Sequence, residues 1–219
     1  FGSLARRQLA PLIDHRVHSI ELNLDAATCE VLDERARAHG RTMASWLLSC
    51  MAVAIGAYTA HVDIVIACPV SLRLAKAYRG TPGALINTVP VRLRTAPHLT
   101  LDEHWQGADD ALRTARGHAF RPAADILRDI RPERIDGISP YGRAIFNFVD
   151  ARDTVGAATL RSARRPHPHA DVYVTVERRD DGLSLAVSMY GERYEPAFLA
   201  TFARAIAHLA RHVDGTVTA

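Results

Sequence analysis

The sequence predicts an α/β fold in which helices pack on the faces of a mixed β-sheet. Three patterns carry this prediction: helical apolar stripes alternate along the chain with strand-like runs, one strand is apolar on both faces, and two late strands form a hairpin. The 219 residues, 48% hydrophobic and 23% charged, suffice for one or two layered cores. No internal repeat divides them, so we expect a single domain over residues 1–219, with an N-terminal arm at 1–16 and a long loop at 151–170.

The first part of the chain predicts a strand, two helices and a second strand. HSIELNL, residues 18–24, alternates as a strand does, and Asp25 is placed to cap a helix that stops at Gly40. Residues 43–58 have apolar side chains at helical spacing and apolar neighbours between them, which indicates a helix buried on most sides. Residues 62–70 are largely apolar on both faces, as in a central strand covered by helices.

A polar pair stands inside the next predicted strand. GALINTVPVRL, residues 83–93, carries Asn87 and Thr88 in an otherwise apolar run, and Pro90 points to an edge strand or a bulge. A buried amide without partners costs about 1–3 kcal/mol. The two side chains therefore either bond backbone groups at such a bulge or face something wet.

The second half of the chain predicts two helices, a strand, a hairpin and a last helix. TLDE, residues 100–103, has the Thr-x-x-Glu spacing of a capping box, and an apolar stripe follows it. A short helix is predicted at Ala123–Ile130 and a strand at residues 142–150. Residues 171–190 form a hairpin around an Asp-Asp-Gly turn, and the last helix covers residues 196–212.

Charge and apolar patterning exclude two classes of partner. The net charge is +3, but the arginines are scattered among acids and Lys76 is the only lysine, which argues against a nucleic-acid partner. The longest uncharged run, residues 43–61, contains Ser, Gly and Tyr and predicts a buried helix, so we expect no membrane partner.

Cysteine and histidine usage gives no sign of a metal site. Cys29, Cys50 and Cys68 are odd in number, have no metal-like spacing and lie on apolar faces, as reduced core thiols of a cytoplasmic protein do. The 11 histidines are dispersed, so we expect no metal. Cys68 stands just before Pro69, but no His or Asp is tied to it by a recognisable spacing, which favours a packed thiol over a nucleophile.

Four segments together resemble the C-terminal half of the condensation domains of nonribosomal peptide synthetases, which have the chloramphenicol-acetyltransferase-like fold of CoA-dependent acyltransferases. AYTAHVDIVIACPVSLR, residues 57–73, is similar to the family's RYTGQEDIVVGTPVAGR-like segment. GALINTVPVR, residues 83–92, is similar to GFFVNTLPLR and is the more specific match.

The other two segments keep part of the family's pattern. HAFRPAADILRDI, residues 118–130, keeps the His and Pro of HQDLPFEKLVEAL but replaces its Gln-Asp and Phe-Glu. ISPYGRAIFNFVD, residues 138–150, keeps Pro140, Phe146 and Asn147 in register with SRNPLFQVMFNYQ, with Ser139 where the family often has Asn. The replaced residues weaken assignment to a standard amino-acid-joining subtype.

The resemblance implies a function for the complete domain and a share of it for this chain. Such a domain joins carrier-tethered acyl or peptidyl and aminoacyl thioesters by amide bond formation, as in antibiotic biosynthesis. The implied partners are peptidyl carrier proteins and the N-terminal half of the domain. No covalently bound cofactor is implied, because the phosphopantetheine arm of the carrier is the tether of the substrate. This half forms one wall of the substrate tunnel.

The resemblance also implies site residues. The tunnel residues are Asn87, Thr88, Asn147 and Ser139. The residues expected to contact the carrier protein are Arg73, Lys76 and Arg79. The family's catalytic His-His-x-x-x-Asp-Gly motif lies in the N-terminal half and is absent from these 219 residues, so we assign no catalytic residue and expect this chain alone to be inactive.

Two sequence motifs match part of the catalytic motifs of related acyltransferases. His167 and Asp171 have the His-x-x-x-Asp spacing but lack the Gly that follows it, and prolines and arginines beside them favour a solvated loop. DHRVH, residues 14–18, resembles the DHRxxDG motif of dihydrolipoyl acyltransferases, but Ser19 and Ile20 replace its Asp and Gly.

Two other functions stay open. The PVSLR variant at residues 69–73 and the altered segment at 118–130 are compatible with an ester-forming O-acyltransferase of the same fold. A noncatalytic module that binds a carrier protein is the third hypothesis.

Overall fold

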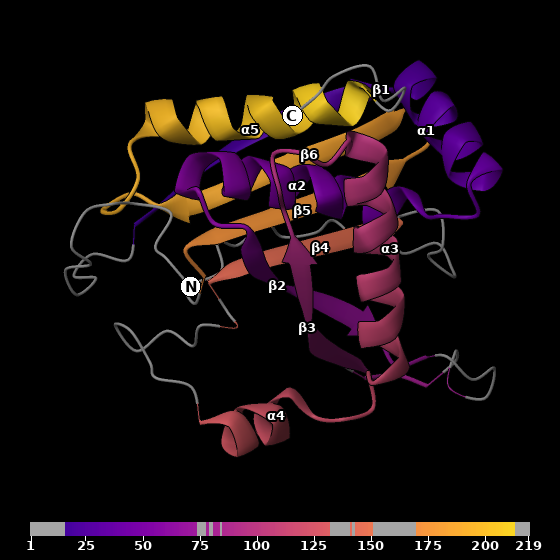
Figure 1. The fold of residues 1–219 in the computed structure, drawn as a ribbon, viewed down its shortest axis with the longest axis vertical. Helices are drawn as coiled ribbons and strands as arrows, with labels where there is room; N and C mark the ends of the chain where they lie inside the picture. The colour runs from indigo at the N-terminus through magenta and orange to yellow at the C-terminus, as the bar shows by residue number, and fades with distance from the viewer. Residues whose placement is uncertain are drawn as a thin grey trace.

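The computed structural model describes residues 16–73, 78, 81–83, 85–131, 141, 143–150 and 170–212. Six strands form one sheet in the order β1-β6-β5-β4-β2-β3 (Figure 1). The strands are β1 (Val17–Asp25), β2 (Asp63–Ser71), β3 (Ile86–Arg94), β4 (Ala144–Asp150), β5 (Val172–Arg179) and β6 (Gly182–Tyr190). The helices are α1 (Ala26–Ala38), α2 (Met43–Thr59), α3 (Leu101–Gly117), α4 (Ala123–Ile130) and α5 (Pro196–Arg211).

The sheet is mixed, as the sequence predicts. β4 runs parallel to β2 and to β5, while the pairs β1–β6, β5–β6 and β2–β3 are antiparallel. The α/β fold class with a mixed sheet is therefore confirmed, and every predicted strand and helix is present.

β3 is an edge strand without a bulge. Its pairing with β2 is continuous from Asp63↔Arg94 to Ser71↔Ile86. Pro90 is tolerated because an edge strand leaves every second backbone N–H outside the ladder. The edge prediction is confirmed, and the alternative that Pro90 forces a bulge is wrong.

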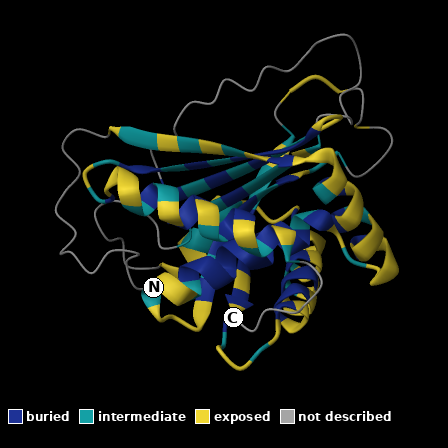
Figure 2. Ribbon diagram, turned by 90° about the horizontal axis from the view of Figure 1, so that it is seen from above, coloured by how far each residue is buried: buried dark blue, intermediate teal, exposed yellow. Residues whose placement is uncertain are grey.

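Helices α1, α2, α3 and α5 lie on one side of the sheet (Figure 2). The side chains that face them are the buried members of each alternating strand, such as Ile66, Val91 and Val174. α2 is buried along most of its length, as predicted. The predicted helical cover on both faces of β2 is only partly confirmed: on its other face α4 lies over Ala67, which is 3% exposed, whereas Val65 and Pro69 are half-buried. No single described helix is long and apolar enough to cross a membrane.

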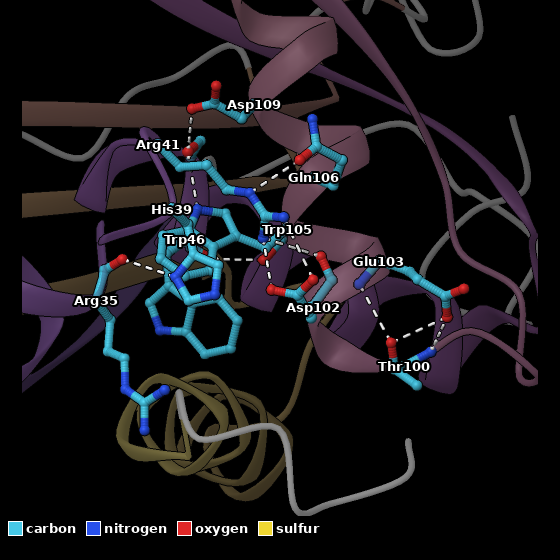
Figure 3. A network of polar contacts seen from close by, with 12 residues as sticks. Arg35, His39, Arg41, Trp46, Thr100, Asp102, Glu103, Trp105, Gln106 and Asp109 are labelled. Carbon is cyan, nitrogen blue, oxygen red and sulfur yellow. Dashed lines mark hydrogen bonds and ion pairs between the residues drawn. The ribbon is translucent and has the colours of Figure 1, made fainter. Parts of the chain in front are cut away.

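A buried polar network joins the start of α2 to the middle of α3 (Figure 3). Asp109 of α3 accepts hydrogen bonds from the Ser45 hydroxyl at 2.6 Å and the Thr42 backbone N–H at 3.2 Å. Ser45 in turn accepts from the indole N–H of Trp105 at 3.0 Å. Trp105 packs edge-to-face on Trp46, with 5.2 Å between ring centroids. This network fixes the two helices against each other, because each buried polar atom has a partner.

Local signals end the elements where the sequence places them. Asp25 caps α1 by accepting from the Thr28 N–H at 2.9 Å, and Thr100 and Glu103 form the predicted capping box of α3. Gly182 follows the two-residue turn of the β5–β6 hairpin with φ +138°, and a Cβ there would lie 2.2 Å from the Leu24 carbonyl oxygen. Only glycine fits this position.

Candidate functional site

The side of the sheet opposite α1, α2, α3 and α5 presents a row of small and polar side chains. We call this side the open face. The strand pairings place Thr88 next to Pro69, Asn147 next to Thr175, and Ala186 next to Glu21. Pro69 and Asn147 each follow by two residues the paired Ala67 and Ile145, so they stand on the same face. The row therefore runs across all six strands, and the side chains in its middle are small.

The structure separates the predicted tunnel residues. Thr88 and Asn147 both stand on the open face, on either side of β2, and both are half-buried. The Asn147 amide makes no side-chain hydrogen bond to any described residue. Asn87 points to the opposite side of β3, because successive side chains of a strand alternate. Ser139 lies outside the described residues.

Asn87 ties the connection between α3 and α4 to β3. Its Nδ2 donates to the carbonyl oxygens of Ala119 and Arg121, both at 2.7 Å, and its Oδ1 accepts from the Ala123 N–H at 3.3 Å. The amide therefore bonds backbone groups, which is one of the two roles that its sequence context allows. It does so across more than thirty residues of sequence rather than at a bulge.

We expect Asn87→Ala to loosen α4. The change leaves two carbonyl groups and one N–H without their partner, which predicts a loss of about 1–2 kcal/mol in the free energy of unfolding. Trypsin should also cut faster after Arg128, because α4 loses its anchor. Asn147→Ala is the matched control and should change neither measurement. Equal cutting rates in Asn87→Ala and the unaltered chain would contradict the role assigned to Asn87.

Arg73 organises the loop after β2. Its guanidinium donates to three carbonyl oxygens, those of Tyr78 at 3.1 Å, Thr81 at 2.6 Å and Gly83 at 2.6 Å. Arg73 thus holds the chain that leads into β3. Lys76 and Arg79, the other two residues predicted to contact a carrier, lie outside the described residues.

A cleft of about 520 Å³ opens at the carboxyl ends of the parallel strands β2 and β4. This is the end of a parallel sheet where ligands commonly bind. Arg37 and Arg116 at its walls make no ion pair with a described residue. Such guanidiniums suit a phosphate or carboxylate. Cys68 also lines the cleft, but burial raises the pKa of its thiol to about 12, so it stays protonated and is no nucleophile.

Asp171 is held by two arginines that belong to no recognisable sequence motif. Its carboxylate accepts from Arg143 Nε at 2.6 Å and from Arg193 Nη1, and Asp171 is 1% exposed. The two outer nitrogens of Arg143 are buried and have no hydrogen-bond partner among the described residues. Asp171 is thus a structural carboxylate here, while His167 and residues 14 and 15 of DHRVH lie outside the described residues. The arginines precede a strand and follow one, positions that carry no recognisable signal.

No described group of three or more His, Cys, Asp and Glu side chains could hold a metal ion. Cys29, Cys50 and Cys68 are buried and form no disulfide, as predicted. His104 is buried, and loss of hydration lowers its pKa. No histidine stands on the open face of the described strands.

Comparison with known proteins identifies the family to which this chain is similar. The condensation-domain family model matches residues 4–216. The chain is 25% identical over 207 residues to an N-(5-amino-5-carboxypentanoyl)-L-cysteinyl-D-valine synthase of Amycolatopsis lactamdurans, covering 91% of this chain and 6% of that protein.

Solved structures share the fold. The condensation domain of the Monacolin K polyketide synthase MokA superposes with a TM-score of 0.76 at 22% identity, over 95% of this chain and 52% of that one. The X-domain from teicoplanin biosynthesis, in a complex with OxyB, superposes with a TM-score of 0.79 at 19% identity, over 95% and 48%. The chain therefore spans about half the length of these two structures and a small part of the synthase.

Proposed function

This chain belongs to the condensation-domain family, and from that premise we propose that it is the C-terminal half of a condensation domain of a nonribosomal peptide synthetase. The complete domain joins two carrier-tethered thioesters: the amine of the acceptor attacks the donor thioester carbonyl, an amide bond forms, and the donor thiol leaves. The observation that carries the proposal is the superposition of nearly the whole chain on about half of a condensation domain.

In this proposal the open face is one wall of the substrate tunnel. Thr88, Pro69 and Asn147 lie side by side on three neighbouring strands. Helices α1, α2, α3 and α5 do not cover them, because these helices lie on the other side of the sheet. The unbonded Asn147 amide can donate to and accept from a tethered amide. Asn87 contributes indirectly, because its hydrogen bond to the first residue of α4 fixes that helix beside this wall. The contribution of this half is positioning of the reactants.

The phosphopantetheine arms belong to the substrates, because each ties its acyl group to a peptidyl carrier protein. The cleft at the ends of β2 and β4 supports the approach of such an arm, since its phosphate would meet Arg37 and Arg116. Arg73 contributes to carrier contact through the loop that it organises. The protein works in the cytoplasm, where its three buried cysteines stay reduced.

An acceptor assay tests the reaction class. The condensation domain that contains this chain is given a donor acyl thioester on one carrier and, on the other, either an amino acid or the hydroxy acid of the same shape. Intact-protein mass spectrometry should find the amide and no ester. Ester formation alone would support the O-acyltransferase instead.

The Asn147→Leu variant tests whether Asn147 belongs to the tunnel wall or to a surface without a role in the reaction. It should lower amide formation about tenfold or more, because a misplaced reactant loses orientation. Asn23→Leu, on the same face but on the edge strand β1, is the matched control and should keep the rate. Equal rates for both variants would remove Asn147 from the wall.

The X-domain in complex with OxyB favours a second candidate, a noncatalytic module that recruits a partner protein. In that case the domain yields neither amide nor ester but still binds a carrier or a neighbouring domain.

A further inference from the structure

A small apolar cavity, partly open to solvent, lies between α4 and the open face of the sheet. Its volume is about 170 Å³. The strands contribute Ala67, Pro90 and Ile145, and the helix contributes Ala123, Ile126 and Leu127. No charged side chain lines it, and its polar groups are the hydroxyls of Thr88 and Tyr141.

The helical wall of this cavity is unusually poor in packing partners. α4 contains no buried residue, although Ile126 and Leu127 point toward the sheet side. Figure 1 shows α4 apart from the other helices, next to the β3 end of the sheet. The apolar side of α4 therefore keeps area that further contact would remove from water, at about 25 cal/mol per Å².

The cavity nevertheless has fixed walls. Asn87 anchors the first residue of α4 through the Ala123 N–H and the preceding turn through two carbonyl groups. Ion pairs Arg121–Asp129 and Arg128–Asp125 brace the helix from its solvent side. A ligand thus meets a preformed space rather than one that it must open.

The size and lining define the ligand. A dry apolar cavity of about 150 Å³ in another protein takes up benzene. We infer that the cavity between α4 and the open face is a binding site for a compact neutral hydrocarbon group of the size of a phenyl ring. Ala123 determines its depth, because it is the smallest side chain on the helical wall and a larger one there fills the space. The inference does not depend on the proposed function.

Toluene is the probe that tests the site, because it has neither charge nor thioester. The chain is titrated with toluene while methyl chemical shifts and the melting temperature are followed. Saturable binding is expected, with shifts at Ile126, Leu127 and Ile145 and a higher melting temperature.

Ala123→Phe should weaken toluene binding at least tenfold and raise the melting temperature without ligand. Ala124→Phe adds the same side chain at an exposed neighbouring position and should leave binding unchanged. If Ala123→Phe does not fold, Ala123→Leu serves with the same expectation. The inference is overturned if toluene does not saturate or if the variant at position 123 binds it as the unaltered chain does.

Discussion

Replacing Asp171 with Asn is expected to lower the free energy of unfolding by about 3–5 kcal/mol. The carboxylate is fully buried and accepts from Arg143 and Arg193, whose side chains are each 5% exposed. The neutral amide leaves two buried cations close together with no carboxylate between them. Loss of one partner of a buried ion pair is costly because the remaining charge has already left water. Urea unfolding, followed by tryptophan fluorescence, measures the difference.

A second variant separates the charge effect from a loss of packing. Asp171→Asn combined with Arg143→Gln removes the cation that depends most on Asp171, since the Arg143 side chain makes no other hydrogen bond to a described residue. The double variant should be more stable than the sum of the two single changes predicts. Asp181→Asn, in the exposed hairpin turn, is the control and should change stability by less than about 0.5 kcal/mol. A similarly small effect of Asp171→Asn would contradict the structural role of this carboxylate.

The chain alone is expected to transfer no acyl group. The open face of its described strands carries no histidine, and the buried imidazole of His104 lies in a cavity on the helical side, between α2 and α3. The chain can orient the reactants, but without an imidazole beside the attacking amine nothing catalyses the proton transfer. The expected effect is loss of the entire measurable rate.

The parts of the fold that the sequence predicts are those that depend on neighbours in the chain. The Asp25 cap, the Thr100 capping box and the limits of α4 follow from residues within one or two turns. The edge position of β3 could be predicted because Pro90 removes a ladder hydrogen bond.

The rest depends on contacts between distant segments. Asn87 meets carbonyl groups 32 and 34 residues away, so its partners leave no pattern around it. Arg143 lies just before β4 and Arg193 shortly after β6, and both bind Asp171. Four of the described helices pack on one face of the sheet and only α4 lies on the other. This follows from which elements pack together, whereas alternation in a strand shows only that its two faces differ.

The central claim is that this chain positions substrates while the reactive imidazole comes from the N-terminal half of the domain. The measurement is amide formation between a donor acyl thioester and an aminoacyl thioester on carrier proteins, with this chain alone and with the N-terminal half added. The account predicts no product from the chain alone and product from the two halves together. An amide formed by the chain alone would contradict it.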